Sequence, residues 1–176
     1  DLIEEMLCWA NVTQAKNILD VGCGIGGSSL YLAEKFGAQA TGITLSPVQA
    51  NRAIERAQSA KLNAHFQVAN ALEMPFADDS FDLVWSLEEC HRVLKPGGTF
   101  IFATWCHRST DRQLLTADEQ KHLEDIYRVY CLPYVISLPE YEQIARDVGF
   151  KGLRSADWST AVAPFWNVVV DSAFTP

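Results

Sequence analysis

A short apolar segment followed by a glycine-rich turn constrains this chain more than any other stretch. Residues 18–21 form a run typical of a buried parallel strand, and Gly22, Gly24 and Gly27 follow it in the spacing G-x-G-x-x-G. Glycines at such a turn let a ligand approach main-chain N–H groups at the start of the next helix. The pattern predicts an α/β fold with a ligand at the carboxyl end of its first strand.

The acidic residue Asp20, two positions before the first glycine, narrows the choice of ligand. A carboxylate there can order the turn and accept hydrogen bonds from a cationic amino-acid ligand, which dinucleotide-binding turns do not require. We therefore favour S-adenosylmethionine, and a nicotinamide or flavin dinucleotide stays open as the alternative. The turn residues expected to contact this cofactor are Gly22, Cys23, Gly24 and Gly26.

Strand and helix patterns alternate along the first two thirds of the chain. The expected strands are residues 18–21, 39–44, 64–68, 81–86 and 99–104, and the expected helices are residues 2–10, 28–36 and 46–60. Residues 95–98, Lys-Pro-Gly-Gly, are expected to form a turn. This alternation predicts one domain with a doubly wound, mostly parallel sheet.

The last third of the chain is expected to contribute further elements. Helices are predicted over residues 116–131 and 137–149, and a sixth strand over residues 152–157. Residues 161–173 favour a helix, although their valine run also fits a strand.

The predicted connection between the fourth and fifth strands is too short. Residues 87–98 must contain a whole parallel crossover, which usually takes a dozen or more residues including its helix. Residues 88–94 supply only about two helical turns. Either the helix is abbreviated or, as we favour, a segment near residues 87–89 is missing from this sequence. A loop there would be a natural active-site lid.

Composition excludes several classes of protein. The chain is 48% hydrophobic and 20% charged, which indicates a folded globular domain. A net charge of −8 argues against nucleic-acid binding, and no stretch is apolar enough to span a membrane. Five cysteines without a C-x-x-C pair suit a reducing compartment, and no metal-ligand spacing is present. No targeting segment is visible, so the cytoplasm is one expected location.

The second strand ends without the acidic residue that holds the cofactor ribose in dinucleotide folds and in most S-adenosylmethionine folds. We expect the hydroxyl of Thr44 and the amide of Gln49 to take over this role, with Leu45 between them. The alternative is that Thr44 is only a strand residue and Gln49 is solvated.

Polar residues also follow the third and fourth strands. The amide of Asn70 is expected to hydrogen-bond the adenine edge beside Ala71 and Leu72, although a simple turn asparagine fits as well. Ser86, Leu87 and Glu88 are expected to face the methionine portion of the cofactor or the acceptor. Glu88 is a catalytic candidate, although a simple solvated acid fits as well.

These segments together resemble a known family. Residues 21–27, 42–49, 81–88 and 92–98 resemble the class I S-adenosylmethionine-dependent methyltransferases, and residues 103–108, 130–134, 156–159 and 162–166 narrow the likeness to γ-tocopherol methyltransferases. The resemblance implies a Rossmann-like fold, S-adenosylmethionine as cofactor and S-adenosylhomocysteine as product. The family carries a Ser-Gly-Glu-His-Met-Pro segment after the position of Glu88, which this chain lacks, as well as an additional N-terminal region and a closing strand.

The resemblance further implies C-methylation of the chromanol ring of γ- or δ-tocopherol, a small lipophilic phenol. A phenol attacks through carbon once its hydroxyl loses a proton, which calls for a base such as histidine. His107 is the visible candidate, although a loop histidine that caps a neighbour fits as well. A histidine in the absent segment is an equal contender.

Residues 106–149 and 158–176 are expected to form a substrate-side cover. Five aromatic side chains are candidates for its pocket: Trp105, Tyr134, Trp158, Phe165 and Trp166. Reaching a lipid substrate would require peripheral membrane contact, in a plastid or in the cytoplasm, and the oligomeric state is left open. The alternatives are N-methylation of a small amine or indole alkaloid, a dinucleotide-dependent oxidoreductase, and a non-catalytic domain.

Overall fold

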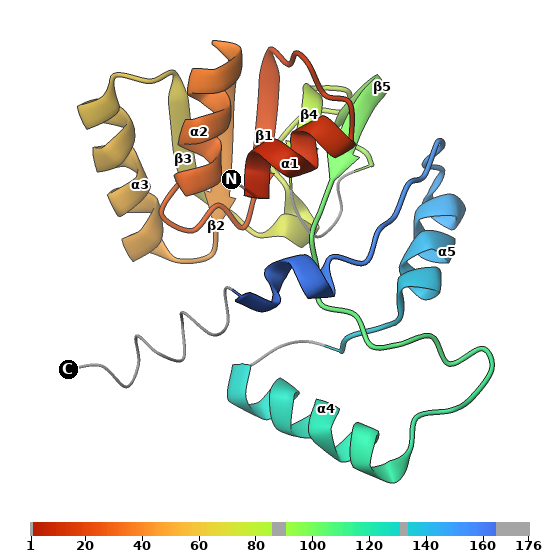
Figure 1. The fold of residues 1–176 in the computed structure, drawn as a ribbon. Coiled ribbons are helices and arrows are strands. Elements are labelled where there is room, and N and C mark those ends of the chain that lie inside the picture. Colours follow the sequence, from red (N-terminus) through yellow and green to blue (C-terminus); the bar gives the residue numbers. More distant parts are fainter. Residues whose placement is uncertain (1, 86–90, 131–133, 165–176) are drawn as a thin grey trace. The chain divides into compact units, whose positions relative to one another are not determined.

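The computed structural model describes residues 2–85, 91–130 and 134–164 (Figure 1). The chain divides into two compact units, residues 1–105 and residues 106–176, and each is described by itself. The division falls where the predicted substrate-side cover begins.

The first unit contains a five-stranded sheet in which all neighbouring strands are parallel. Its strands, in the spatial order β3-β2-β1-β4-β5, are β1 (Asn17–Val21), β2 (Gln39–Thr44), β3 (Ala64–Val68), β4 (Phe81–Trp85) and β5 (Leu94–Ile101). The predicted doubly wound parallel sheet is confirmed, and the predicted bounds of β2 and β3 agree with the structure.

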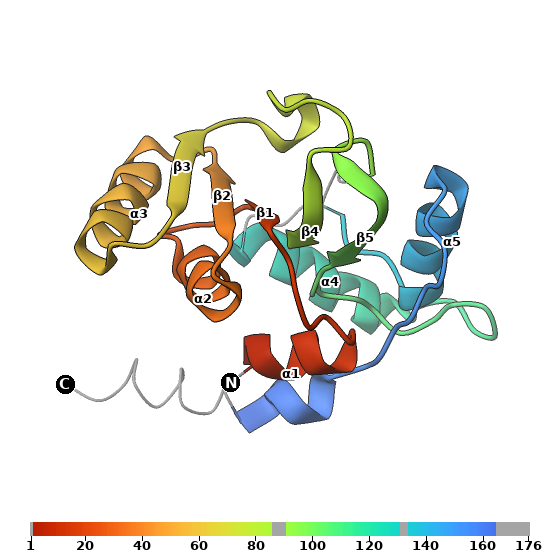
Figure 2. The same ribbon diagram turned by 90° about the horizontal axis from the view of Figure 1, so that it is seen from above.

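Three helices accompany this sheet: α1 (Leu2–Trp9), α2 (Gly27–Phe36) and α3 (Pro47–Ala60). Helix α2 packs on β1 and β2, and α3 packs on β3 and β2. Figure 2 shows α1 and α2 on the same side of the sheet. The helix ends follow the sequence signals, because Ser46 caps α3 through a hydrogen bond from the Gln49 N–H and Gly37 ends α2 at a φ of 58°.

Strand β5 differs from the prediction. It begins at Leu94, which pairs with Phe81, and the next pair is Leu83 with Thr99, so residues 95–98 form an irregular bulge within the strand instead of a turn before it. Strand pairing starts early because the Ser80 and Phe81 N–H groups already donate to the Val93 carbonyl oxygen. A proline is tolerated at such a bulge on an edge strand.

The predicted helix before β5 is not formed where the structure can be judged. Residues 91–93 form a turn, and residues 86–90 lie outside the described residues. Because β5 begins at Leu94, residues 86–93 alone connect two parallel neighbours. The connection is therefore even shorter than the sequence predicted.

The second unit contains α4 (Ala117–Tyr130) and α5 (Leu138–Val148), both as predicted, and helical backbone at residues 159–164. The predicted strand at residues 152–157 is wrong. Most of these side chains are exposed, so the segment has no apolar face to pack on a sheet. No helix within the described parts of the chain is long and apolar enough to cross a membrane.

Candidate functional site

The carboxylate of Asp20 lies buried at the end of β1, with only 3% of its surface exposed. The Ser29 hydroxyl, in the first turn of α2, donates to Asp20 Oδ2 at 2.6 Å. Burial raises the pKa of Asp20 to about 6, and hydrogen bonds from Ser29 offset part of that rise. No lysine, arginine or histidine of the described segments forms an ion pair with this carboxylate. A cationic ligand group would therefore find a carboxylate without a charged partner.

The glycine turn after β1 is fixed by main-chain hydrogen bonds. Gly22 and Cys23 donate their N–H groups to the Ile43 carbonyl oxygen at 2.9 and 3.0 Å. Gly24 adopts a φ of 55°, and a Cβ atom there would meet nothing within 4 Å. The turn is thus seated on β2 through Ile43, whereas Asp20 bonds the start of α2, and the Gly24 side of the turn is open.

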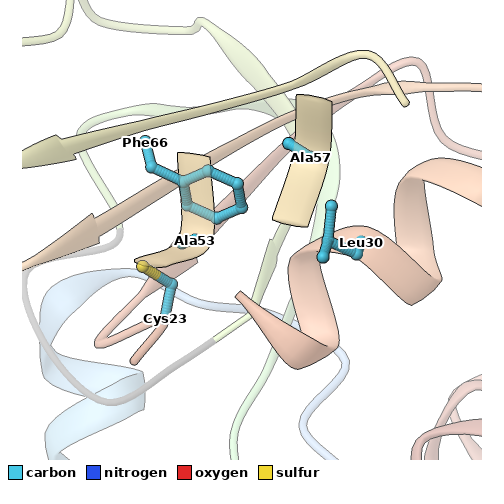
Figure 3. Packing of buried hydrophobic residues seen from close by; sticks show 5 residues of the cluster. All are labelled: Cys23, Leu30, Ala53, Ala57 and Phe66. Atoms are coloured by element: carbon cyan, nitrogen blue, oxygen red, sulfur yellow. The ribbon is translucent and has the colours of Figure 1, made fainter. Parts of the chain in front are cut away.

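A cluster of buried side chains packs against the glycine turn. Figure 3 shows Phe66 of β3 in a buried cluster with Cys23, Leu30, Ala53 and Ala57. A Cβ atom on Gly42 would lie 2.5 Å from the Phe66 ring, and one on Gly26 would lie 2.7 Å from it. Glycine is therefore required at both positions if the ring is to keep its place.

Cys23, expected to contact the cofactor, is buried within this cluster. Burial, together with the nearby charge of Asp20, raises the pKa of its thiol to about 12. The thiol is therefore neutral at physiological pH and contributes packing rather than nucleophilic chemistry.

The structure brings Thr44 and Gln49 together at the end of β2. The Thr44 hydroxyl donates to Gln49 Oε1 at 2.9 Å and accepts from the Ser46 N–H at 3.2 Å. With its oxygen engaged, the Gln49 amide offers its NH₂ group as a hydrogen-bond donor. Leu45, at the same strand end, is 74% exposed and presents an apolar surface.

Asn70 follows β3 and begins a short 3-10 helix, η1 (Ala71–Glu73). Its Oδ1 accepts from the Leu72 N–H at 3.0 Å, so the oxygen has the simple turn role. The adenine contact expected of Asn70 could come only from its NH₂ group, and it stays a prediction. Leu72 is 61% exposed, which leaves its side chain available to pack against a flat ring.

The sheet register aligns these positions. Asp20 pairs with Gly42 and Thr44 pairs with Val68, so the ends of β1, β2 and β3 meet at one edge of the sheet. The predicted cofactor residues of these three strand ends therefore gather at one edge. Ser86 and Glu88 lie outside the described residues.

His107, the predicted base, belongs to the second unit. Its Nδ1 lies 2.7 Å from the Arg108 carbonyl oxygen, which can only accept, so Nδ1 carries the hydrogen. Nε2 lies 4.0 Å from Glu140 Oε2, and the side chain is 9% exposed. Because Nδ1 carries the hydrogen, Nε2 is the ring nitrogen that could accept a proton. The role of His107 as the catalytic base stays a prediction.

The predicted pocket aromatics are divided between the units. Trp105 ends the first unit, and Tyr134 and Trp158 belong to the second, where the Tyr134 ring lies 6.4 Å from that of Tyr127. Phe165 and Trp166 lie outside the described residues. Within the part of the chain that can be described, no three histidine, cysteine or acidic side chains are grouped as metal ligands would be.

Two residues that support the site were not identified from the sequence. Ser29 contacts Asp20, and Phe66 fills the space beneath the glycine turn. Gly42 carried a usable signal for Phe66, because a glycine inside a strand often marks the close approach of another group.

Comparison with known proteins identifies the family. A family model described as a methyltransferase domain matches residues 18–98, from β1 into β5. The chloroplastic tocopherol O-methyltransferase of Arabidopsis thaliana is 46% identical over 99% of this chain and 57% of its own length. Norajmaline N-methyltransferase of Rauvolfia serpentina is 31% identical over 99% of this chain and 67% of its own length. The chain belongs to the class I S-adenosylmethionine-dependent methyltransferases.

Solved structures confirm the methyltransferase fold. A geranyl diphosphate C-methyltransferase from Streptomyces coelicolor A3(2), crystallised with Mg²⁺, geranyl diphosphate and S-adenosyl-L-homocysteine, gives a TM-score of 0.84 at 23% identity, over 99% of this chain and 70% of its own. A putative sarcosine dimethylglycine methyltransferase from Galdieria sulphuraria gives 0.76 at 25% identity, over 99% and 72%.

The methyltransferase chain spans somewhat more than half the length of the two tocopherol methyltransferases that it matches. Its alignment with the Arabidopsis relative extends over 197 positions, whereas the chain has 176 residues. The relative therefore contains residues within the aligned region that this chain lacks. This agrees with the shortened connection between β4 and β5.

Proposed function

We propose that this methyltransferase binds S-adenosylmethionine at the carboxyl edge of its sheet and directs methyl transfer to a ring carbon of a tocopherol-type phenol. The likeness to the chloroplastic tocopherol methyltransferases, 46% identity over 99% of the chain, carries this proposal. When bound, the sulfonium supplies the methyl group by in-line displacement.

The geometry of the glycine turn supports this cofactor over a dinucleotide. Two main-chain N–H groups of the turn, those of Gly22 and Cys23, donate to the Ile43 carbonyl oxygen and are not available to a pyrophosphate. The ionised carboxylate of Asp20 would also repel a pyrophosphate, whereas it attracts the ammonium group of a methionine portion.

The remaining cofactor contacts follow from the strand ends. The NH₂ group of Gln49 is suited to donate to the ribose hydroxyls, and that of Asn70 to a ring nitrogen of adenine. Leu45 and Leu72 offer exposed apolar surface for the adenine faces. Each contact is a direct hydrogen bond or an apolar packing surface, so each can be tested by substitution.

Transfer to carbon requires the phenol to lose its proton. His107 would have to accept this proton at Nε2, the nitrogen that lies 4.0 Å from Glu140 Oε2. The other candidates are Glu88 and a histidine in the segment that this chain lacks between β4 and β5. We propose residues 106–149 and 158–176 as the substrate-side cover, with pocket walls from Trp105, Tyr134, Trp158, Phe165 and Trp166.

A second candidate function is N-methylation of a small alkaloid amine. It is favoured by the norajmaline and ajmaline N-methyltransferases, which are 31% and 32% identical and of which the chain covers 67%. A neutral amine attacks through its own lone pair and needs no base to deprotonate a phenol.

Transfer of a labelled methyl group from S-adenosylmethionine distinguishes these functions. We expect label in γ-tocopherol but not in an indole-alkaloid amine. The tocopherol relatives are named O-methyltransferases, so the product must also be examined. A ring-methylated product keeps a phenolic hydroxyl that can be acetylated, whereas a methyl ether does not. Label on the amine, or on the oxygen, would contradict the proposal.

The chloroplastic names of the two tocopherol relatives support a plastid location for this protein. A tocopherol dissolves in the membrane, so we propose peripheral contact with a plastid membrane during substrate uptake. Flotation with galactolipid vesicles tests this, and protein that stays at the bottom of the gradient with and without γ-tocopherol contradicts it.

A further inference from the structure

We infer that Arg92 is a positioning residue for the adenine end of the cofactor site: its guanidinium fixes the loop of residues 70–80 that presents Asn70 and Leu72. This inference rests on the proposed function, because it assigns a role within the same site. Arg92 belongs to the turn before β5 and lies far from this loop in the sequence.

The guanidinium group donates three hydrogen bonds to the loop. Nη1 donates to the Phe76 carbonyl oxygen at 2.8 Å and to Asp78 Oδ1 at 2.7 Å, and Nη2 donates to the Met74 carbonyl oxygen at 3.0 Å. The acceptors occur at every second residue of the loop. The rigid, planar donor set of an arginine suits such an arrangement, whereas a lysine ammonium group would not reach all three.

Main-chain bonds join the same two segments. The Asp79 N–H donates to the Arg92 carbonyl oxygen at 3.2 Å, directly before β4 begins. At the other end of the loop, Asn70 caps η1. Residues 70–80 are therefore fixed at the start by Asn70 and at the end by Arg92, and Leu72 lies between these points.

The Asn70 cap holds the backbone of Leu72, whereas packing restrains its side chain little. Its side chain is 61% exposed, and a hollow of about 150 Å³ lies beside it, lined by Ala71, Leu72, Glu73, Met74 and Arg92. A loop with few packing contacts samples other shapes when its hydrogen bonds are lost. Ordering it again on ligand binding would cost affinity.

The three hydrogen bonds of the guanidinium group to Phe76, Asp78 and Met74 all go to protein acceptors, so Arg92 acts on a ligand through the loop. Some of the loop would remain ordered without it, since Met74 is buried and Phe76 packs edge-to-face on Phe81 at 5.2 Å. Substitution should therefore weaken cofactor binding without unfolding the first unit.

The test measures S-adenosylhomocysteine binding by calorimetry for the wild-type protein, Arg92→Ala, Arg92→Lys and Arg52→Ala. Arg52 is the matched control, because it is an exposed arginine of the same unit whose ion pair is with Glu55 on its own helix. We expect the Kd to rise about ten-fold in Arg92→Ala, less in Arg92→Lys, and not at all in Arg52→Ala. Thermal unfolding verifies that each variant is folded, and Arg92→Lys serves if Arg92→Ala is not.

A double-mutant cycle with Leu72→Ala distinguishes positioning from general loss of structure. If Arg92 acts through Leu72, Arg92→Ala adds little to the Kd of Leu72→Ala. Fully additive effects, or an Arg92→Ala Kd equal to that of Arg52→Ala, would overturn the inference alone. Wild-type protein that does not bind S-adenosylhomocysteine would overturn the proposed function as well.

Discussion

Residues 1–105 and the described residues 106–164 are stabilised by different kinds of interaction. In the first unit, the sheet and its helices bury nearly all of the described apolar core, with Leu7, Ile18, Leu19 and Leu83 almost inaccessible. In the second unit, Val135 is the single buried apolar side chain among the described residues.

Charged hydrogen bonds take a larger part in the second unit. The Arg108 guanidinium binds both carboxylate oxygens of Glu119 at 2.7 and 2.8 Å, and Glu140 accepts from the Ser137 hydroxyl and N–H. The strand ends where we propose that the cofactor binds are therefore built on a packed scaffold, whereas the proposed cover owes its local shape to exposed polar contacts. Substitutions should therefore have much larger effects in the first unit.

The largest effect is expected for Phe66→Ala. Removing a ring that is 8% exposed and packed beneath Gly26 and Gly42 should cost about 3 kcal/mol of unfolding free energy. Urea denaturation measures this cost. The control is Leu114→Ala in the second unit, at a side chain that is 78% exposed, which should change stability by less than about 0.5 kcal/mol. Equal losses of unfolding free energy for the two substitutions would contradict the difference in packing between the two units.

A similar effect, dependent on pH, is expected at Asp20. Its pKa of about 6 lies above the ordinary 3.8, so the folded state takes up a proton before the unfolded state does. The stabilisation that comes from protonated Asp20 in the folded state is complete below about pH 4 and is lost as the pH rises through 6. At pH 8 the buried carboxylate should cost about 3 kcal/mol.

Asp20→Asn tests this directly. At pH 8 the variant should be more stable than the wild type, with the difference shrinking towards pH 4, and it should bind S-adenosylhomocysteine at least about ten-fold more weakly. Urea denaturation at both pH values and calorimetry provide the measurements. A variant that is less stable than the wild type at pH 8 contradicts the account of this carboxylate.

A smaller effect is expected for Gly42→Ala. The new Cβ would lie 2.5 Å from the Phe66 ring, and relieving this contact should cost about 1–3 kcal/mol of unfolding free energy. Gly27→Ala is the matched control, because a Cβ there meets nothing within 4 Å at the start of α2. It should leave stability unchanged or slightly raised. Equal destabilisation by both alanines would show that Phe66 does not fill this space.

The smallest effect on unfolding is expected for Arg108→Ala. Its guanidinium lies at the surface, where paired charges contribute little, although it also binds the Gln113 and Leu114 carbonyl oxygens. We expect amide exchange at residues 109–116 to become faster while the midpoint of urea unfolding stays constant. Arg128→Ala, which removes an exposed pair with Asp125, should alter neither. A large shift of the urea midpoint for Arg108→Ala would mean that the Arg108–Glu119 pair stabilises the fold beyond residues 109–116.

Much of the first unit could be predicted from the sequence because its signals are local. Buried strands appear as apolar runs, and Ser46, Pro47 and Gly37 mark helix ends in the way their chemistry requires. The start of β5 could not be predicted. The pairing of Leu94 with Phe81 and the bond from Lys95 to Asp82 join distant segments, and the Lys-Pro-Gly-Gly sequence indicates a turn when considered alone.

The candidate site shows the same division. Asp20, the glycine turn and the Thr44–Gln49 pair carry local patterns, so the sequence indicated them. Phe66 packs against Gly26 and Gly42, and Arg92 donates to Met74, all of which are many residues away in the sequence. No local sequence pattern predicts such contacts. Residues 152–157 have a sequence that favours a strand, but most of their side chains are exposed. They have no apolar face to pack on a sheet, so no strand forms.

We propose that Asp20 and the glycine turn of residues 22–27 bind the amino-acid end of S-adenosylmethionine. Titration of the ¹⁵N-labelled protein with S-adenosylhomocysteine, and separately with NAD, tests it most directly. We expect S-adenosylhomocysteine to shift the amide signals of Asp20, residues 22–27, Gln49 and Asn70, and NAD to shift none of them. Shifts at these residues with NAD, or no shift there with S-adenosylhomocysteine, would contradict it.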